Sequence, residues 1–276
     1  MEEQIRHTHG DGQSAQRSVT CVIEDNVATI TLNRPHKLNS LNLEMQEALQ
    51  EILREVAATS AVRAVLLTGA GRAFCAGQDL NERKASPGAA PRDLGRTIEQ
   101  MWNPLARALR YLEIPVVCAV NGVAAGGGAS IALAADIVFA ARSAVFVQAF
   151  SKIGLIPDVG STYYLPRLVG VARAMGMTML SETVTAQQAE RWGLIWRCVD
   201  DDELLATARD TAVLLAHGPT GSLGKLKRAL YESLDNSFED QLDLERRSQR
   251  ACGFLEDYCE GVAAFHEKRL PKFTGK

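Results

Sequence analysis

The segment 119–137, AVNGVAAGGGASIALAADI, contains three adjacent glycines, Gly126, Gly127 and Gly128, between an apolar run and an alanine-rich stretch. Glycine destabilises the interior of a helix or a strand. A run of three therefore indicates a turn in which another group must approach a backbone that carries no side chains. This feature constrains the fold most, because it requires a tight turn between two buried elements.

A second glycine-bordered turn follows another apolar run. The two segments read AVLLTGAGRAFCAGQD (64–79) and VVCAVNGVAAGGGAS (116–130). Neighbouring buried strands place their C-terminal loops together, and ligands bind in the crevice between them. Two such turns can aim two backbone N–H groups at one oxyanion, with the Gly127 N–H at the start of a helix. Tight packing of the turns alone also explains these glycines, so the spacing leaves both interpretations open.

Hydrophobic periodicity predicts alternating strands and helices in the N-terminal two-thirds of the chain and helices in the last third. Short apolar runs predict strands within 19–32, with a turn at Asp25-Asn26, and at 62–69, 115–120 and 136–141. Apolar residues at three- and four-residue spacing predict helices after Asn42 and over 94–109, and from about residue 161 the strand signal fades. The pattern indicates an α/β fold. We expect a flexible tail at 1–18, a core at 19–200, a helical region at 201–276 and a mobile loop at 81–93.

Composition excludes several classes of function. The net charge of -3 gives no reason to expect nucleic acid as a partner. The six cysteines include no C-x-x-C pair, which predicts neither a metal site nor a disulfide framework and favours the reducing cytoplasm. His7 and His9 lie in the polar tail, so we expect no metal there. The uncharged stretch 114–135 contains Pro115 and four glycines, so we expect a buried strand, turn and helix rather than a membrane span.

The glycine clusters do not match nucleotide-binding or hydrolase motifs. After Gly126 and Gly128, Ile131 stands where a dinucleotide-binding G-x-G-x-x-G motif needs its last glycine, and 69–74 fails at the same position. The stretch 218–226 lacks the P-loop spacing. Residues 128–132 resemble a nucleophile elbow but end in Ala132.

Four ordered motifs, NRPHKLNSLN (33–42), LTGAGRAFCAGQDL (67–80), NGVAAGGGASIALAADI (121–137) and GLIPDVGSTYYLPRLVG (154–170), resemble the crotonase, or enoyl-CoA hydratase/isomerase, superfamily. The resemblance implies a crotonase-like spiral of ββα units with a helical C-terminal trimerisation region. It implies an acyl-CoA substrate and a homotrimer or a hexamer made of two trimers. No separate cofactor is implied, since coenzyme A is part of the substrate. By motif position, the backbone amides of Gln78 and Gly127 would hold the thioester oxygen.

The same resemblance assigns the acidic residues. Hydratases of the superfamily carry two glutamates, at positions that are Ser130 and Phe150 in this chain. Neither of these side chains shuttles protons at neutral pH, so simple hydratase activity is not expected. Asp158 matches an acidic position of dienoyl-CoA isomerases and is our candidate catalytic residue. We interpret Asp79 as a residue that orients the oxyanion loop rather than as a base.

Further stretches resemble one branch of the superfamily, the isomerases of phenylacetate degradation that convert ring-1,2-epoxyphenylacetyl-CoA to oxepin-CoA. These stretches are GQDL (77–80), QAFSKIGLIPD (148–158), EDQLDLERRSQR (239–250) and KRLPKFTGK (268–276). The resemblance implies a cytoplasmic isomerase of aromatic degradation. It also leaves open a shift of a 3-enoyl to a 2-enoyl double bond on a later intermediate.

Substrate contacts are carried over from the same motifs. Coenzyme A would lie across 36–41 and 76–80, with Lys37 and Arg72 as the nearest cations for its phosphates. The candidate substrate-binding residues are Lys37, Leu38, Ala76, Gly77, Asp79, Leu80, Gly126 and Phe150. Four aromatic residues either line an aromatic acyl pocket or belong to the core: Trp102, Phe146, Phe150 and Tyr163.

Two alternatives remain from the sequence. The first is a Δ3,Δ2-enoyl-CoA or dienoyl-CoA isomerase, or an enoyl-CoA hydratase, of fatty-acid oxidation, and a substrate panel distinguishes it. The second is a non-catalytic acyl-CoA-binding protein that keeps only the fold. Asp158 and the two intact glycine turns argue against this second alternative.

Overall fold

The long strands form one twisted sheet of six strands in the order β1-β2-β3-β5-β7-β10. The computed structural model describes residues 17–83 and 92–276, so residues 1–16 of the expected tail and most of the expected 81–93 loop lie outside the described residues. Strand β1 is antiparallel to β2, and all other neighbours in this sheet are parallel. The strands are β1 (Val19–Glu24), β2 (Val27–Leu32), β3 (Ala64–Gly69), β5 (Val116–Val120), β7 (Ile137–Ala141) and β10 (Arg197–Val199).

A second sheet has four short strands in the order β4-β6-β8-β9. Strands β4, β6 and β8 are parallel, and β9 runs antiparallel to β8. They are β4 (Ala73–Cys75), β6 (Val123–Ala125), β8 (Val145–Val147) and β9 (Thr183–Thr185). We did not predict these short strands or β10, and β9 and β10 lie in the part of the predicted core 19–200 where the strand signal fades. Three residues are too few to show the two-residue alternation of a strand.

Strands of the two sheets alternate along the chain and produce a spiral. Each of β3, β5 and β7 in the large sheet is followed at once by β4, β6 and β8 in the small one. A helical segment then leads back to the large sheet, so the repeating unit is strand, strand, helix. This confirms the predicted crotonase-like α/β spiral of ββα units. The loops after β4 and β6 lie next to each other because those two strands are paired.

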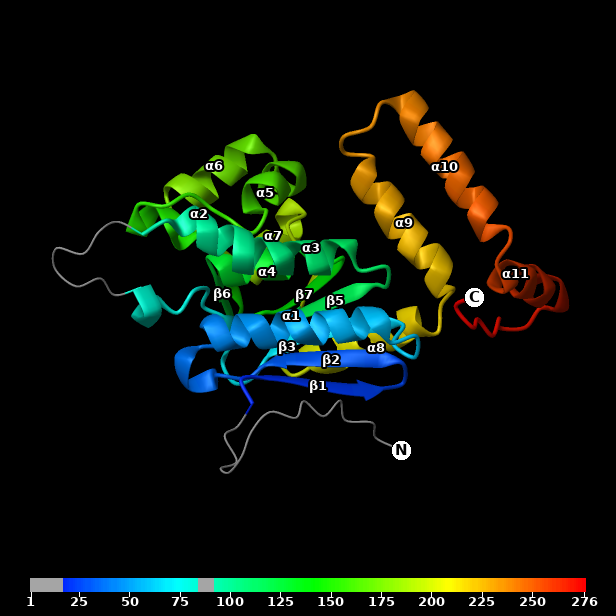
Figure 1. Cartoon of the computed structure of the whole chain (residues 1–276), viewed down its shortest axis with the longest axis horizontal. Coiled ribbons are helices and arrows are strands. Elements are labelled where there is room, and N and C mark those ends of the chain that lie inside the picture. The colour runs from blue at the N-terminus through cyan, green and yellow to red at the C-terminus, as the bar shows by residue number, and fades with distance from the viewer. Residues whose placement is uncertain (1–16, 84–91) are drawn as a thin grey trace.

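Helices cover both sheets and complete the chain (Figure 1). They are α1 (Leu43–Ala58), α2 (Leu94–Thr97), α3 (Asn103–Tyr111), α4 (Gly127–Leu133), α5 (Ser161–Val169), α6 (Val171–Met179), α7 (Ala186–Trp192), α8 (Leu204–Ala216), α9 (Thr220–Glu232), α10 (Phe238–Cys252) and α11 (Glu256–Glu267), with 3-10 turns η1 (Pro35–Lys37), η2 (Leu80–Arg83) and η4 (Ala149–Ile153). The predicted cap is confirmed, since the Asn42 side chain accepts a hydrogen bond from Met45 N.

The predicted helix over 94–109 is present but is interrupted by a π-helical turn. Helices α2 and α3 flank a π-helix at Ile98–Trp102 (η3). Pro104 sits in the first turn of α3, where its missing N–H and its ring favour a change of winding. Such π-turns occur frequently at functional sites. This one ends at Trp102, whose side chain is buried.

The stretch 114–135 folds as predicted, as buried strand, turn and helix: β5, β6 and α4. Across residues 17–83 and 92–276, the structure contains no helix with the length and apolar character needed to cross a membrane. Helix α8 packs against β3 and β5 of the large sheet. Its buried face explains why the apolar residues Leu204, Ala208 and Ala212 recur at four-residue spacing.

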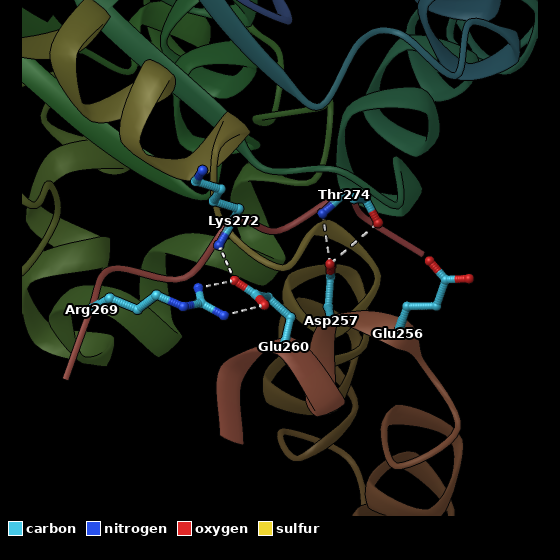
Figure 2. A pocket seen from close by; sticks show the side chains of 6 residues that line it. All are labelled: Glu256, Asp257, Glu260, Arg269, Lys272 and Thr274. Atoms are coloured by element: carbon cyan, nitrogen blue, oxygen red, sulfur yellow. Dashed lines mark hydrogen bonds and ion pairs between the residues drawn. The ribbon is translucent and has the colours of Figure 1, made fainter. Parts of the chain in front are cut away.

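The last three helices stand apart from this core. In Figure 1, α9 and α10 form a hairpin that projects from the body, and α11 lies at its base near the C-terminus. Figure 2 shows how the final residues are tied to α11. The Asp257 carboxylate accepts hydrogen bonds from Thr274 N (2.7 Å) and Gly275 N (2.9 Å), and Glu260 pairs with Arg269. Arg63, next to β3, donates to Phe273 O (3.0 Å), so the tail also contacts the core.

Candidate active site

The two glycine turns meet, as the sequence predicted. Gly77 follows β4 and has φ +88°. A Cβ at Gly77 would lie 2.7 Å from Ala125 O and 3.3 Å from Gly127 N, in the turn after β6. Only a residue without a side chain permits this approach, and it is easy for glycine to adopt a positive φ. The first turn is therefore packed directly on the backbone of the second.

Two backbone N–H groups in these turns are open. Leu41 forms a parallel bridge with the first turn. Leu41 N donates a hydrogen bond to Gly77 O (2.7 Å), and Leu41 O accepts one from Asp79 N (2.9 Å). In a parallel bridge the residue between those two groups, Gln78, directs its own N–H away from Leu41. Gly127 is the first residue of α4, where helix N–H groups have no intrahelical acceptor. Within residues 17–83 and 92–276, neither N–H has an acceptor.

Each glycine of the triplet meets a different constraint. Gly126 has φ +52°, a conformation that favours glycine. A Cβ at Gly127 would lie 2.8 Å from the ring of Trp102. A Cβ at Gly128 would lie 2.7 Å from the Cβ of Cys75 in β4. The triplet thus serves packing, which confirms that interpretation. It also leaves the Gly127 N–H without an acceptor within the described residues, and the oxyanion interpretation stays a prediction.

The Gln78 side chain links the first turn to its surroundings. Its Oε1 accepts hydrogen bonds from Gln46 Nε2 (3.2 Å), Trp102 Nε1 (3.2 Å) and Arg83 Nη2 (3.4 Å). Its Nε2 donates to Leu41 O (3.2 Å). Beside it lies a cavity of about 420 Å³ lined in part by Gln46, Gln78 and Arg83. This network fixes the direction of the Gln78 backbone.

Asp79 is buried, and its carboxylate is paired. Its carboxylate forms an ion pair with Arg34 (3.1 Å) and accepts hydrogen bonds from Asn81 N (3.1 Å) and Asn81 Nδ2 (3.0 Å). Burial alone would raise the pKa of Asp79, but the hydrogen bonds from Asn81 and Arg34 hold it below the ordinary value. A paired carboxylate of low pKa is a poor base. The geometry agrees with our interpretation that Asp79 orients the loop.

Asp158 has the opposite environment. Within the part of the chain that the structure describes, its Oδ1 atom is buried and has no hydrogen-bond partner. Burial raises the pKa of this carboxyl from 3.8 to about 6, against the opposing effects of a backbone hydrogen bond and the charge of Arg83. The next residue, Val159, has φ 54°, which is strained for a β-branched side chain. A carboxyl with one unpartnered oxygen and a pKa near neutrality, in a strained turn, is suited to proton transfer.

Ser130 and Phe150 occupy the two positions discussed as hydratase glutamates. Ser130 is fully buried in α4, and its hydroxyl contacts Ser161. Phe150, in η4, has a ring 3.8 Å from the position of a Cβ on Gly126. Phe150 therefore borders the glycine turn, as expected for a residue that binds substrate. Neither residue brings a second carboxylate to the site.

The segment expected to contact coenzyme A runs beside the first turn. Leu38 O accepts a hydrogen bond from Ala76 N (3.0 Å), which joins the 36–41 segment to the 76–80 loop. Lys37 and Arg72 are exposed, and Leu80 is 52% exposed. The predicted contacts thus lie on adjacent loops with two cations at the surface.

Two of the four aromatic candidates border the turns. Trp102 faces Gly127, and Phe150 faces Gly126. Phe146 is 1% exposed in β8 and belongs to the core. Tyr163 packs against the core, the other alternative left open by the sequence: its hydroxyl donates to Asp235 (2.9 Å), and Arg167 stacks on its ring. It lines a different cavity, of about 350 Å³, which Tyr231 of α9 also borders.

The sequence did not single out four residues that the fold brings to these turns: Gln46, Arg83, Gln148 and Ser161. Ser161 and Gln148 lie inside quoted motifs, so the segments were recognised although the side chains were not. Gln46 is a buried polar residue on an otherwise apolar helix face, and this was the one available signal. Within the described residues, no group of three His, Cys, Asp or Glu side chains is placed to hold a metal ion.

Sequence and structure comparisons identify the family. The enoyl-CoA hydratase/isomerase family matches residues 22–276. The chain is 54% identical over 254 residues to the 1,2-epoxyphenylacetyl-CoA isomerase of Escherichia coli K12, which covers 92% of this chain and 97% of that protein. It is 32% identical to the trans-2-decenoyl-[acyl-carrier-protein] isomerase of Streptococcus mutans, again over 92% of this chain and 97% of that protein.

Among solved structures, the enoyl-CoA hydratase from Bacillus anthracis superposes with a TM-score of 0.88 at 33% identity, covering 94% of this chain and 100% of that one. The agreement extends over nearly the whole chain in sequence and in fold. It includes the spiral core and the two glycine turns. The chain therefore belongs to the enoyl-CoA hydratase/isomerase family, the crotonase superfamily.

Proposed function

We propose that this protein is an isomerase of acyl-CoA thioesters that converts 1,2-epoxyphenylacetyl-CoA to oxepin-CoA in phenylacetate catabolism. The observation that carries the proposal is Asp158, an unpaired, partly buried carboxyl whose pKa is raised to about 6. The substrate class is supported by 54% identity to the isomerase of Escherichia coli. No separate cofactor is required, because isomerisation redistributes bonds without net oxidation and coenzyme A belongs to the substrate.

The proposed mechanism uses the two open N–H groups and one base. The thioester oxygen accepts hydrogen bonds from Gln78 N–H and Gly127 N–H. Asp158 removes a proton from the carbon next to the thioester carbonyl, and the electron pair moves onto that oxygen as an enolate. The proton then returns to another carbon, which shifts the double bond of a 3-enoyl thioester. In the epoxide, the bond between the two oxygen-bearing ring carbons also breaks as the ring electrons rearrange, which gives the seven-membered oxepin without addition of an atom. One oxyanion donor contributes about 2.7–4 kcal/mol to such a step.

Hydration is disfavoured by the absence of a second carboxylate. Adding water to a double bond requires activation of the water and protonation of carbon. Ser130 and Phe150 supply no charge for either task, and Asp79 is held by Arg34 and Asn81. A single carboxyl is sufficient for a proton shift. A shift of a 3-enoyl to a 2-enoyl double bond uses the same groups, so we expect this second activity with Asp158 as its base.

For substrate binding, we propose that coenzyme A lies across residues 36–41 and 76–80. Lys37 and Arg72 are the exposed cations beside this path. The acyl group would then extend toward Trp102 and Phe150, whose rings flank the glycine triplet. Two aromatic faces suit a six-membered ring, which stacks on them in offset or edge-on geometry.

We further propose that the chain assembles as a homotrimer or as a dimer of trimers in the cytoplasm. Exposed apolar side chains gather on α9, α10 and α11, among them Leu230 (61%), Phe238 (73%) and Phe265 (80%). A separate apolar patch on α6 and just after it includes Val171 (60%), Met179 (67%) and Leu180 (74%). Two different patches on one chain favour head-to-tail contacts, which close into a ring. Sedimentation velocity at micromolar concentration tests this, and a monomer would contradict it.

The function is tested in deuterated water with two substrates, cis-3-hexenoyl-CoA and 1,2-epoxyphenylacetyl-CoA. We expect conjugation of the first, with deuterium gain but no addition of water, and an oxepin product of unchanged formula from the second. The rate should rise with pH through an apparent pKa of about 6. Asp158→Asn should lose at least about 100-fold in rate, since general acid–base catalysis contributes about 10²–10⁴-fold.

Asp210→Asn is the matched control, since Asp210 is an exposed carboxyl on α8, and it should retain full activity. Addition of water to a 2-enoyl-CoA at a comparable rate would overturn the proposal. So would full activity of Asp158→Asn, or conversion of neither substrate by protein that still binds acyl-CoA. The last outcome would instead support the acyl-CoA-binding alternative.

A further inference from the structure

The peptide unit that carries the Gly127 N–H also carries the Gly126 carbonyl, and that carbonyl is doubly held. It accepts hydrogen bonds from Ser130 N (3.1 Å) and from Ser130 Oγ (3.2 Å). On the other side, Gly126 N donates to Val147 O (2.8 Å). Both lone pairs of the carbonyl oxygen are used, so the plane of this peptide is fixed. Its N–H direction is fixed with it.

The Ser130 hydroxyl is itself the end of a chain of buried side chains. Ser161 Oγ lies 2.6 Å from Ser130 Oγ, and Gln148 Nε2 donates to Ser161 Oγ (3.3 Å). Ser130 gives its proton to Gly126 O, so Ser161 must be the donor in the hydroxyl pair. Every bond therefore points the same way, from Gln148 through Ser161 and Ser130 to the peptide. Ser130 and Ser161 are 0% exposed and Gln148 is 1% exposed.

We propose that Ser130 and Ser161 are positioning residues that polarise the Gly126–Gly127 peptide for the thioester oxygen. A carbonyl that accepts hydrogen bonds draws electron density from its amide nitrogen, so the N–H of the same peptide becomes a stronger donor. Aligned hydrogen bonds reinforce one another by about 10–30% per bond. This inference rests on the proposed function, because it assigns the Gly127 N–H to the thioester oxygen.

A serine bonded to the carbonyl four residues earlier is common in helices and by itself shows nothing. Two observations set Ser130 apart. First, its hydroxyl is hydrogen-bonded to Ser161, which lies in another helix, α5. Second, Ser161 N donates a hydrogen bond to Asp158 O (3.0 Å) in the strained turn. The chain thus connects the turn that carries the proposed base to the peptide that carries the proposed oxyanion donor. Burying a hydroxyl costs free energy unless its proton has an acceptor, and the last hydroxyl of this chain donates to the Gly126 carbonyl.

The test measures polarisation of a bound ligand that needs no turnover. Cinnamoyl-CoA is the probe, because its conjugated thioester absorbs at longer wavelength when the carbonyl oxygen accepts stronger hydrogen bonds. We expect the wild-type red shift to decrease in Ser130→Ala and to decrease less in Ser161→Ala. Ser130→Ala should also lower kcat on cis-3-hexenoyl-CoA. One oxyanion donor contributes about 10²- to 10³-fold to the rate, and about 10–30% of that factor on a logarithmic scale is a loss of about 2- to 8-fold.

Non-additivity distinguishes positioning from packing. If Ser161 acts through Ser130, the double variant Ser130→Ala/Ser161→Ala should show the same red shift as Ser130→Ala alone. Ser130→Cys keeps the volume with a weaker donor and should give an intermediate shift. Thr211→Ala is the matched control, since Thr211 Oγ1 makes the same bond to Thr207 O (2.8 Å) in α8, and it should leave the red shift unchanged.

The inference is overturned if folded Ser130→Ala, or Ser130→Cys where alanine prevents folding, retains the wild-type red shift, or if the Ser161 effect adds fully to that of Ser130. Failure of the proposed function is a separate result. Wild-type protein that red-shifts cinnamoyl-CoA but converts no substrate would refute the isomerase and leave the positioning role supported. Activity that depends on Asp158, with an unchanged red shift in Ser130→Ala, would refute only the positioning role.

Discussion

Replacing Asp158 by asparagine should make the protein more stable at neutral pH while abolishing its activity. Burial raises the pKa of the folded carboxyl from 3.8 to about 6. Two pKa units correspond to about 3 kcal/mol, and partial exposure of the side chain reduces this to about 1–2 kcal/mol. Asparagine has the same shape and no charge, so it removes this cost. The unpartnered Oδ1 is the structural reason for the cost.

The sign of the pH dependence follows from proton binding. Between pH 3.8 and about 6 the folded state holds the Asp158 proton more tightly than the unfolded state. Wild-type stability therefore falls as pH rises through this window and remains lower above it. The difference between Asp158→Asn and wild type should be near zero at pH 3.8 or below and about 1–2 kcal/mol at pH 7.5.

Urea unfolding at several pH values, at one fixed protein concentration, measures this difference. The concentration must be fixed because assembly contributes to apparent stability. A difference that grows between pH 4 and pH 7 supports the account. Equal stability of the two proteins at every pH would refute it, since the carboxylate would then carry no burial cost and could not have the raised pKa that the proposed base requires.

Two further substitutions test the loops around the site. Gly128→Ala should destabilise the protein by about 3 kcal/mol or prevent folding, because the added Cβ would lie 2.7 Å from the Cys75 Cβ. The control in urea unfolding is Gly253→Ala, whose added Cβ meets nothing closer than 3.4 Å. Asp79→Asn should cost about 1–3 kcal/mol at pH 7. Because the folded pKa of Asp79 lies below 3.8, this contribution is fully present above that pH and is lost as pH falls through the folded pKa, so the loss seen in thermal unfolding should be smaller at pH 3 than at pH 7.

Features that depend on neighbours in sequence were predictable. The turn at Asp25 and Asn26 is confirmed, and both residues have positive φ, which these short polar side chains tolerate. The helix after Asn42 buries Met45, Leu49, Ile52 and Val56, the residues whose spacing predicted it. The meeting of the two glycine turns was also predictable, because a parallel sheet brings the C-terminal ends of its strands to one edge.

Features that depend on side chains distant in sequence were not predictable. Trp102 reaches Gln78 only because a π-turn rotates the end of its helical segment, and a pattern of apolar spacing does not distinguish π from α winding. For Tyr163, aromatic character alone left the acyl pocket and the core as alternatives. Its position on α5 instead directs it to Asp235, beyond the end of α9, which no local signal revealed.

The candidate site is best recognised by which backbone groups lack partners. In the loop after β4, Ala76 N donates to Leu38 O, Gly77 N to Cys75 Sγ and Asp79 N to Leu41 O. Buried backbone N–H groups are nearly always paired. In this loop the N–H groups next to Gln78 all have acceptors, and within the described residues that of Gln78 has none, so it is available to a ligand. Gly77 then fixes where that donor points, because its contact with Ala125 O sets the spacing to Gly127. The proposed chemistry thus depends on main-chain geometry that glycine permits, together with Asp158 as the proposed reactive side chain.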